Sequence, residues 1–178
     1  MIRVTYLLSG ILLSSLLGCA VVTKEPPRFT PVSGFNLERY LGTWYEIARM
    51  DFTFERDLSN VTANYTLNNN GTIKVVNRGY NYKTKKWKQA VGKAKFAGTQ
   101  DEGRLKVSFF GPFYAAYNII AQDNEYKYAL VVGKNLDYIW ILSCETTIPD
   151  EIKQNYLDIA QKLGFNTSIL VWTDQSPK

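Results

Sequence analysis

Histidine is absent from this chain of 178 residues, and cysteine occurs only at Cys19 and Cys144. Without histidine the chain has no Ser-His-Asp or Cys-His catalytic arrangement, and most zinc sites lose a usual ligand. A phosphate-binding glycine loop is also missing, and the carboxylates, Glu46 among them, form no evident close pair with a reason for shifted pKa values. We therefore expect a protein that is not an enzyme and has no catalytic residues, no metal site and no cofactor.

The composition indicates one domain with a large core. Hydrophobic residues make up 46% of the chain and aromatic residues 14%, which suits one domain better than two domains or a disordered protein. The formal net charge is +5, and one lysine-rich segment concentrates it. The lysines of this segment are Lys83, Lys85, Lys86, Lys88, Lys93 and Lys95. They predict either a solvated, aggregation-resistant pair of strands or a patch that meets anionic lipid head groups.

The first residues have the pattern of an export signal. Arg3 supplies a positive charge, and the apolar run from Tyr6 to Leu17 is too short to span a bilayer comfortably. The run ends in Leu16-Leu17-Gly18-Cys19, which resembles the bacterial lipobox, where cleavage falls before the cysteine and that cysteine receives acyl chains. An ordinary secretory signal with an incidental cysteine is the alternative.

Lipidation of Cys19 would attach the protein to a membrane without spanning it, because several acyl chains anchor far more firmly than one. Ala20 stands where similar enteric lipoproteins held at the inner membrane have aspartate, which implies the outer membrane. There the domain would face the periplasm, and nucleic acid is not an expected partner. We expect a signal peptide over residues 1–18, a proline-containing lipidated tether over 19–33 and the folded domain over 34–178. Cys144 would then be the lone cysteine, and we expect a small buried hydrophobe rather than a reactive thiol.

Alternating apolar and polar residues predict eight antiparallel strands joined by short turns. The predicted strands begin at Trp44 and continue over 61–67, 73–77, 90–96, 105–109, 114–121, 126–132 and 138–143. An up-and-down barrel is the most economical arrangement because closure removes both exposed sheet edges. A two-sheet sandwich is the alternative.

Two helices and a final strand complete the predicted all-β fold. Asn36, with an acidic residue three positions later, predicts a short helix that stops at Gly42. Pro149 and the stop at Gly164 bound a longer helix whose apolar stripe needs a surface to lie against, and we expect it outside the barrel. Residues 168–172 predict a short strand beside the first.

Three stretches resemble the bacterial lipocalins, a branch similar to apolipoprotein D. They are Gly42-Thr43-Trp44-Tyr45-Glu46-Ile47-Ala48, Val107-Ser108-Phe109-Phe110-Gly111-Pro112-Phe113-Tyr114 and Tyr138-Ile139-Trp140-Ile141-Leu142-Ser143. With the lipobox, the chain looks like an outer-membrane lipocalin lipoprotein, with Gly42 and Trp44 at the closed end of the barrel. The resemblance implies binding of fatty acids or lysophospholipids, for storage or transport in envelope maintenance, by a monomer or a homodimer.

Cys144 departs from this resemblance. The family usually has an arginine there that lies across the signature tryptophan, so Arg39 or tighter packing would have to cover Trp44 instead.

The register that places lysine and threonine outward puts small residues among aromatic ones on the inner face, which favours a cavity over a filled barrel. The predicted ligand-binding residues are Tyr65, Val75, Asn77, Ala94, Val107, Phe109, Tyr114, Asn118, Trp140 and Leu142. An acyl chain would lie against the apolar members, and the tyrosines and asparagines would meet a head group near the mouth. Each of these side chains can equally belong to a plain core.

Two other functions stay open. A filled barrel would make the protein a scaffold or interaction lipoprotein that acts through its surface. An enzyme, such as a lipid hydrolase or isomerase on the same barrel, would need an acid and a base other than histidine.

Overall fold

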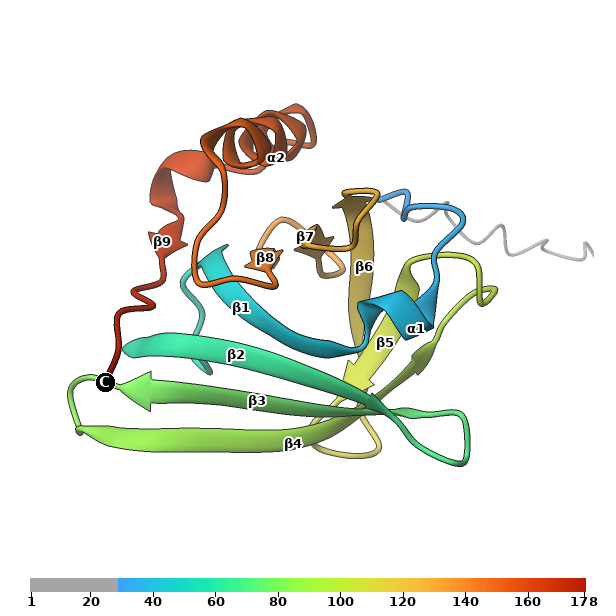
Figure 1. Cartoon of the computed structure of the whole chain (residues 1–178), viewed down its shortest axis with the longest axis horizontal. Coiled ribbons are helices and arrows are strands. Elements are labelled where there is room, and N and C mark those ends of the chain that lie inside the picture. Colours follow the sequence, from blue (N-terminus) through green and yellow to red (C-terminus); the bar gives the residue numbers. More distant parts are fainter. Residues whose placement is uncertain (1–28) are drawn as a thin grey trace, which may run out of the picture.

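The computed structural model describes residues 29–178 (Figure 1). The predicted signal peptide, the lipidation of Cys19 and most of the tether lie outside these residues. Within residues 29–178 no helix has the length and apolar character needed to cross a membrane.

The described chain forms nine strands, two α-helices and one 3-10 turn, in the order that Figure 1 labels. The helices are α1 (Leu37–Tyr40) and α2 (Asp150–Lys162), and the 3-10 turn is η1 (Thr167–Ile169). The strands are β1 (Gly42–Arg49), β2 (Leu58–Leu67), β3 (Ile73–Asn81), β4 (Lys86–Phe96), β5 (Arg104–Ser108), β6 (Ala115–Gln122), β7 (Tyr128–Val132), β8 (Ile139–Ser143) and β9 (Val171–Trp172).

The sheet closes into an antiparallel barrel. Its strand order is β2-β3-β4-β5-β6-β7-β8-β1-β9. β1 also pairs with β2, so the strands β1 to β8 form a closed ring. β9 extends the sheet beside β1, where Ala48 pairs with Trp172. The predicted up-and-down barrel and the final strand are confirmed, and the sandwich is wrong. Because the ring closes within residues 29–178, this segment contains a complete barrel.

α1 begins and ends as its sequence predicts. The Asn36 side chain accepts a hydrogen bond from the Arg39 main-chain N–H at 3.2 Å, which caps the first turn. Gly42 follows the helix with a φ of 109°, a conformation that only glycine adopts without strain, and turns the chain into β1. α1 therefore lies at the end of the barrel where β1 begins (Figure 1). We call this end the floor and the opposite end the mouth.

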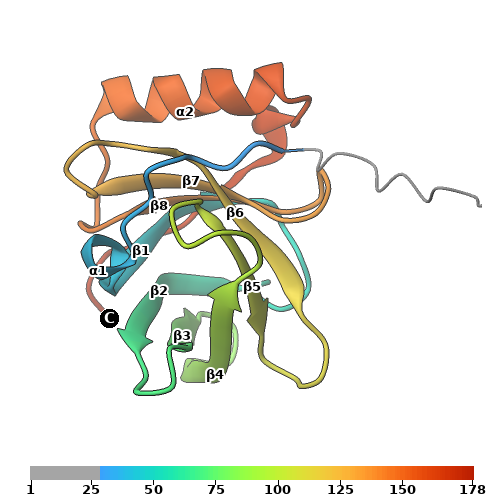
Figure 2. The same cartoon turned by 90° about the vertical axis from the view of Figure 1, so that its right-hand side faces the viewer.

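α2 lies outside the barrel and across β7 and β8, as Figure 2 shows. Its buried residues, Tyr156 and Ala160, pack in one apolar cluster with Ile139 and Ile141 of β8. Trp140 belongs to a second cluster on the inner face of the same sheet. β8 therefore presents one face to the helix and the other to the interior, and the predicted position of the helix outside the barrel is confirmed.

The second strand begins earlier than the predicted range of 61–67. β2 begins at Leu58 rather than near Val61. Asn60 has a φ of 49°, and the β2–β3 register shifts between Ser59 and Thr62. This irregularity interrupts the apolar alternation, which is why the pattern does not mark the first residues of the strand.

Candidate functional site

The inner wall of the barrel is buried at its floor and partly exposed toward its mouth. On five strands the inner-face residue nearer α1 is buried, while the next inner-face residue toward the other end is partly exposed. These buried and partly exposed pairs are Tyr65 and Ala63, Val75 and Asn77, Ala94 and Gly92, Leu105 and Val107, and Leu142 and Trp140. Cross-strand pairing of Ala63 with Asn77, Val75 with Gly92, and Ala94 with Val107 places these residues on one face. On these five strands the inner wall is therefore more exposed away from α1 than beside it.

Aromatic side chains close the floor. Tyr40 stacks on Trp44 with ring centroids 4.6 Å apart, and the Trp44 indole N–H donates to the Tyr40 carbonyl at 2.8 Å. The Tyr117 hydroxyl lies 2.7 Å from that of Tyr40 and 2.8 Å from that of Tyr65. Burial raises the pKa of all three phenols, so this cluster stays neutral and supplies polar partners without charge.

Among residues 29–178, Tyr40 covers Trp44 and no cation does. Arg39 instead lies over the ring of Tyr126, 4.3 Å from its centroid. Of the two predicted ways to cover Trp44, Arg39 or tighter packing, the structure has tighter packing. Cys144 is exposed, and its thiol donates to the Tyr126 carbonyl at 3.4 Å, so the prediction that Cys144 is a buried hydrophobe is wrong.

Most of the predicted ligand-binding residues lie on the inner face. Those in the interior apolar cluster are Tyr65, Val75, Ala94, Val107, Phe109, Trp140 and Leu142, and Asn77 joins them by its pairing with Ala63. Their contact with a ligand stays a prediction. Tyr65 belongs to the floor cluster rather than to the mouth, where we expected it to meet a head group.

Tyr114 and Asn118 are on the outer face, so their predicted interior position is wrong. Tyr114 lies under the ammonium groups of Lys95 and Lys106, two outward side chains. Asn118 donates to the carbonyls of Val132 and Gly133 at 3.4 and 3.1 Å. The true inner residues of β6 are the neighbours Tyr117 and Ile119. Both faces of β6 carry apolar residues because its outer face reaches the cluster under α2, so alternation gives no signal there.

Gly92 makes room for Phe109 inside the barrel. A Cβ atom at Gly92 would meet the Ser108 carbonyl oxygen at 2.6 Å and the Phe109 ring at 2.7 Å. The wall is therefore shaped at this point by the absence of a side chain, which leaves the space that the Phe109 ring occupies.

A bulge in β1 turns Arg49 into the interior, on the same face as Glu46. Glu46 pairs with Leu142 and Arg49 with Trp140, and the register shifts by one residue between them. Because Leu142 and Trp140 face inward, both Glu46 and Arg49 do so as well. Each is only 2% exposed, and Arg49 Nη1 donates to Glu46 Oε1 at 2.7 Å.

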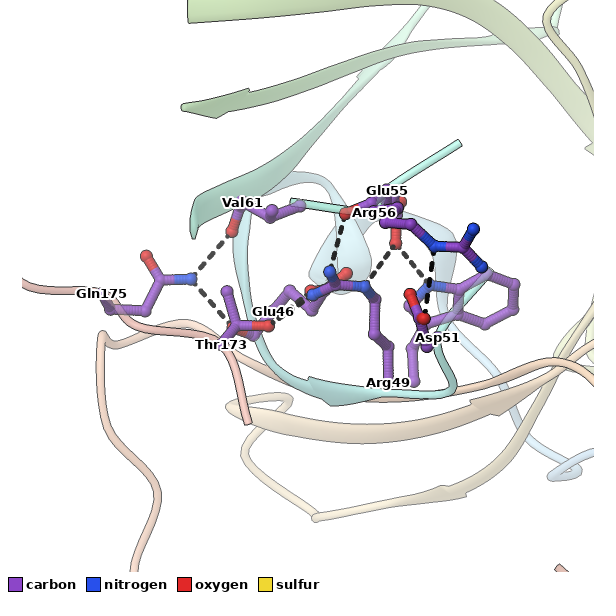
Figure 3. Close-up of polar contacts among 9 residues, drawn as sticks. Glu46, Arg49, Asp51, Glu55, Arg56, Val61, Thr173 and Gln175 are labelled. Atoms are coloured by element: carbon purple, nitrogen blue, oxygen red, sulfur yellow. Dashed lines mark hydrogen bonds and ion pairs between the residues drawn. The ribbon is translucent and has the colours of Figure 1, made fainter. Parts of the chain in front are cut away.

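Glu55, from the loop between β1 and β2, completes this charged cluster (Figure 3). Its carbonyl accepts from Arg49 Nη2 at 2.6 Å, and its carboxylate accepts from Trp140 Nε1 at 3.2 Å. Arg49 Nε lies 3.8 Å from the same carboxylate. Burial raises the pKa of Glu55 well above its usual range, and the nearby Glu46 raises it further. The expectation that no carboxylates form a close pair with shifted pKa values is therefore wrong.

The C-terminal segment holds the same cluster from the other side. Thr173 donates to the Glu46 carboxylate and accepts from Arg49 Nη1 at 3.0 Å. Gln175 Nε2 donates to the carbonyls of Glu46 and Val61 at 2.8 and 2.9 Å (Figure 3). It thereby bridges β1 and β2 beyond the last pair of their ladder, Tyr45 and Thr62.

Two inner polar atoms are buried without a hydrogen bond, although Arg49 Nε keeps its ion pair with Glu55. Asn77 Oδ1 and Arg49 Nε are buried, and neither makes a hydrogen bond within the described chain. Both belong to the partly open half of the interior. The arrangement offers an apolar wall below and polar groups above, which suits an amphipathic molecule with its apolar part inward.

The closed eight-stranded ring, its aromatic floor and the helix packed outside it define a β-barrel of the lipocalin class. The family model of the lipocalin-like domain matches residues 35–175, and the chain belongs to the lipocalin family.

Relatives in sequence and solved structures are consistent with this family. The chain is 50% identical over 163 residues to the outer membrane lipoprotein Blc of Escherichia coli (strain K12), covering 91% of this chain and 92% of the relative. It is 33% identical over 151 residues to apolipoprotein D of Mus musculus, covering 80% and 78%. Insecticyanin from the tobacco hornworm Manduca sexta has the same fold, with a TM-score of 0.69 at 20% identity over 82% of this chain and 84% of that one.

Proposed function

We propose that this lipocalin is an outer-membrane lipoprotein that holds a fatty acid or a lysophospholipid in its barrel and stores or carries it for envelope maintenance. The anchor is the acylated Cys19, and the domain faces the periplasm. The similarity to a bacterial outer membrane lipoprotein supports the location. The observation that carries the ligand class is the gradient of exposure along the inner wall, buried at the floor and accessible at the mouth.

An acyl chain fits this gradient. It would enter between Asn77 and Trp140 and lie against Val75, Ala94 and Val107, gaining about 0.8 kcal/mol for each methylene removed from water. The head group would stay at the open half, within reach of Asn77 Oδ1 and the charged cluster. The floor tyrosines already bond to one another, so they limit the depth of the site rather than bind a head group.

Native mass spectrometry with lipid extraction tests the proposal. Residues 29–178, produced in a bacterium and purified without detergent, should carry one fatty acid or lysophospholipid per barrel, and the same spectrum distinguishes monomer from homodimer. A protein that is empty and also refuses added lysophospholipid would contradict lipid carriage and favour a surface role.

A variant pair locates the ligand. Ala94→Trp fills the inner wall at a residue that is 4% exposed, so we expect lysophospholipid affinity to fall roughly tenfold or more. Val91→Trp places the same ring on the outer face of β4 and should leave affinity unchanged. The fluorescence of Trp140 should respond to lipid in the parent protein. Unchanged affinity in a folded Ala94→Trp protein would place the ligand elsewhere.

A further inference from the structure

Four lysines gather on the outer face of β3, β4 and β5 without acidic partners. The register pairs Lys74 with Lys93 and Lys95 with Lys106, so two pairs of like charges lie directly opposite each other across the strands. We call Lys74, Lys93, Lys95 and Lys106 the basic patch. None of them takes part in an ion pair or a side-chain hydrogen bond of residues 29–178.

The surroundings of the basic patch do not relieve this repulsion. The next residues along the same two rows are Thr66 and Ser108 in one and Ala116 in the other, and all three are uncharged. Like charges in direct cross-strand contact destabilise a sheet. The four lysines of the basic patch therefore destabilise the folded protein by their mutual repulsion, and an anionic partner would remove this repulsion.

An exposed aromatic loop adjoins the basic patch. Phe110 and Phe113, in the loop between β5 and β6, are 70% and 78% exposed. The next residue, Tyr114, joins the loop to the patch, because the ammonium groups of Lys95 and Lys106 lie 5.1 and 5.7 Å from its ring centroid. Aromatic side chains with adjacent lysines are the composition of surfaces that enter the head-group region of a bilayer.

We propose that the basic patch and the Phe110–Phe113 loop dock the barrel on a bilayer that contains anionic phospholipid. The lysines meet the head-group charge, and the two phenylalanines enter the interface beside them. The proposed lipidation of Cys19 supports this inference, since the ten residue-to-residue steps from Cys19 to Phe29 span at most about 35 Å. An anchored domain stays close to the membrane, so a weak surface contact is enough to orient it.

Vesicle co-sedimentation of residues 29–178 tests the docking. Vesicles with about one third phosphatidylglycerol in phosphatidylcholine should bind the protein at low salt and release it as salt rises, and pure phosphatidylcholine vesicles should bind it much less. Since each basic residue near an anionic surface changes the partition constant roughly fivefold, reversal in Lys95→Glu should weaken binding about ten- to thirtyfold. Phe113→Ser should weaken it several-fold.

Stability and a distant lysine separate docking from unfolding and from general charge. Lys95→Glu turns a like-charge pair into an attractive pair with Lys106, so its melting temperature should hold or rise while its vesicle binding falls. Lys134→Glu changes the net charge equally but lies in the turn between β7 and β8, away from the patch, and should bind nearly as the parent does. Parental binding by both Lys95→Glu and Phe113→Ser, equal loss in Lys134→Glu, or no anionic preference would overturn the inference.

Binding of lysophospholipid in the barrel is measured separately from docking on vesicles. Lysophospholipid affinity in Lys95→Glu should equal that of the parent, because Lys95 lies outside the barrel. A parent protein without cargo that still docks through the patch would contradict the proposed function alone.

Discussion

The floor and the mouth of the same barrel interior solve the problem of buried polar groups in opposite ways. At the floor, three neutral tyrosine hydroxyls bond to one another beneath Trp44. At the mouth, Arg49 lies between two carboxylates, Glu46 and Glu55, with all three side chains largely removed from water. Neutral groups cost little to bury once they are bonded, whereas buried charges depend on every partner being present.

The two ends should therefore differ in how much stability is lost when one bonding partner is removed. At the floor, the three hydroxyls satisfy one another within the barrel. The charged cluster joins four separate parts of the chain, namely β1, the β1–β2 loop, β8 and the C-terminal segment. Removal of one partner at the mouth should therefore cost more than removal of one hydroxyl at the floor.

The largest effect is expected for Arg49→Met. Loss of the guanidinium leaves Glu46 and Glu55 buried without a cation, which should lower the free energy of unfolding by about 3–5 kcal/mol. Urea unfolding followed by tryptophan fluorescence measures it. Arg104→Met is the matched control, because its partner Glu102 is exposed to solvent, and it should cost less than about 1 kcal/mol. Equal losses in the two variants would show that the cluster is not the weak point of the mouth.

Tyr117→Phe tests the floor. It removes the hydroxyl that Tyr40 and Tyr65 share and leaves both of them with one buried partner fewer, so we expect a loss of about 1–3 kcal/mol. Tyr82→Phe removes an exposed hydroxyl that bonds to Asp57 and should change stability by less than about 0.5 kcal/mol. If Tyr117→Phe cost as much as Arg49→Met, the contrast between floor and mouth would be lost.

The sequence predicts the floor far better than the mouth. Alternation in β2, β3, β4 and β8 assigns the inner face correctly, and the cap at Asn36 with Gly42 locates the closed end. These features are local, and each leaves its own pattern in the chain.

The charged cluster has no such local pattern. The bulge in β1 adds one residue, which reverses the face on which Arg49 lies, and period-two alternation cannot register that step. Glu55 and Thr173 come from irregular segments far apart in the sequence. The sequence does offer one signal, because Glu46 and Arg49 are three residues apart in β1. Two residues at this spacing face the same side of a strand only if a bulge lies between them.

Glu55→Gln gives the smallest change in stability and the sharpest test of the charge at the mouth. Because the pKa of Glu55 is raised in the folded protein, the fold holds a proton that the unfolded chain has released. This contribution is fully present below the ordinary glutamate pKa and is lost as the pH rises through the raised value. Glutamine cannot ionise and keeps an oxygen for Trp140 Nε1, so the variant should match the parent at low pH and exceed its stability as the pH rises. Unfolding across roughly pH 3 to 9, which starts below the ordinary glutamate pKa, measures both curves, with the exposed Glu145→Gln as control. Parallel curves would mean that Glu55 is ionised throughout and that Arg49 balances two full charges.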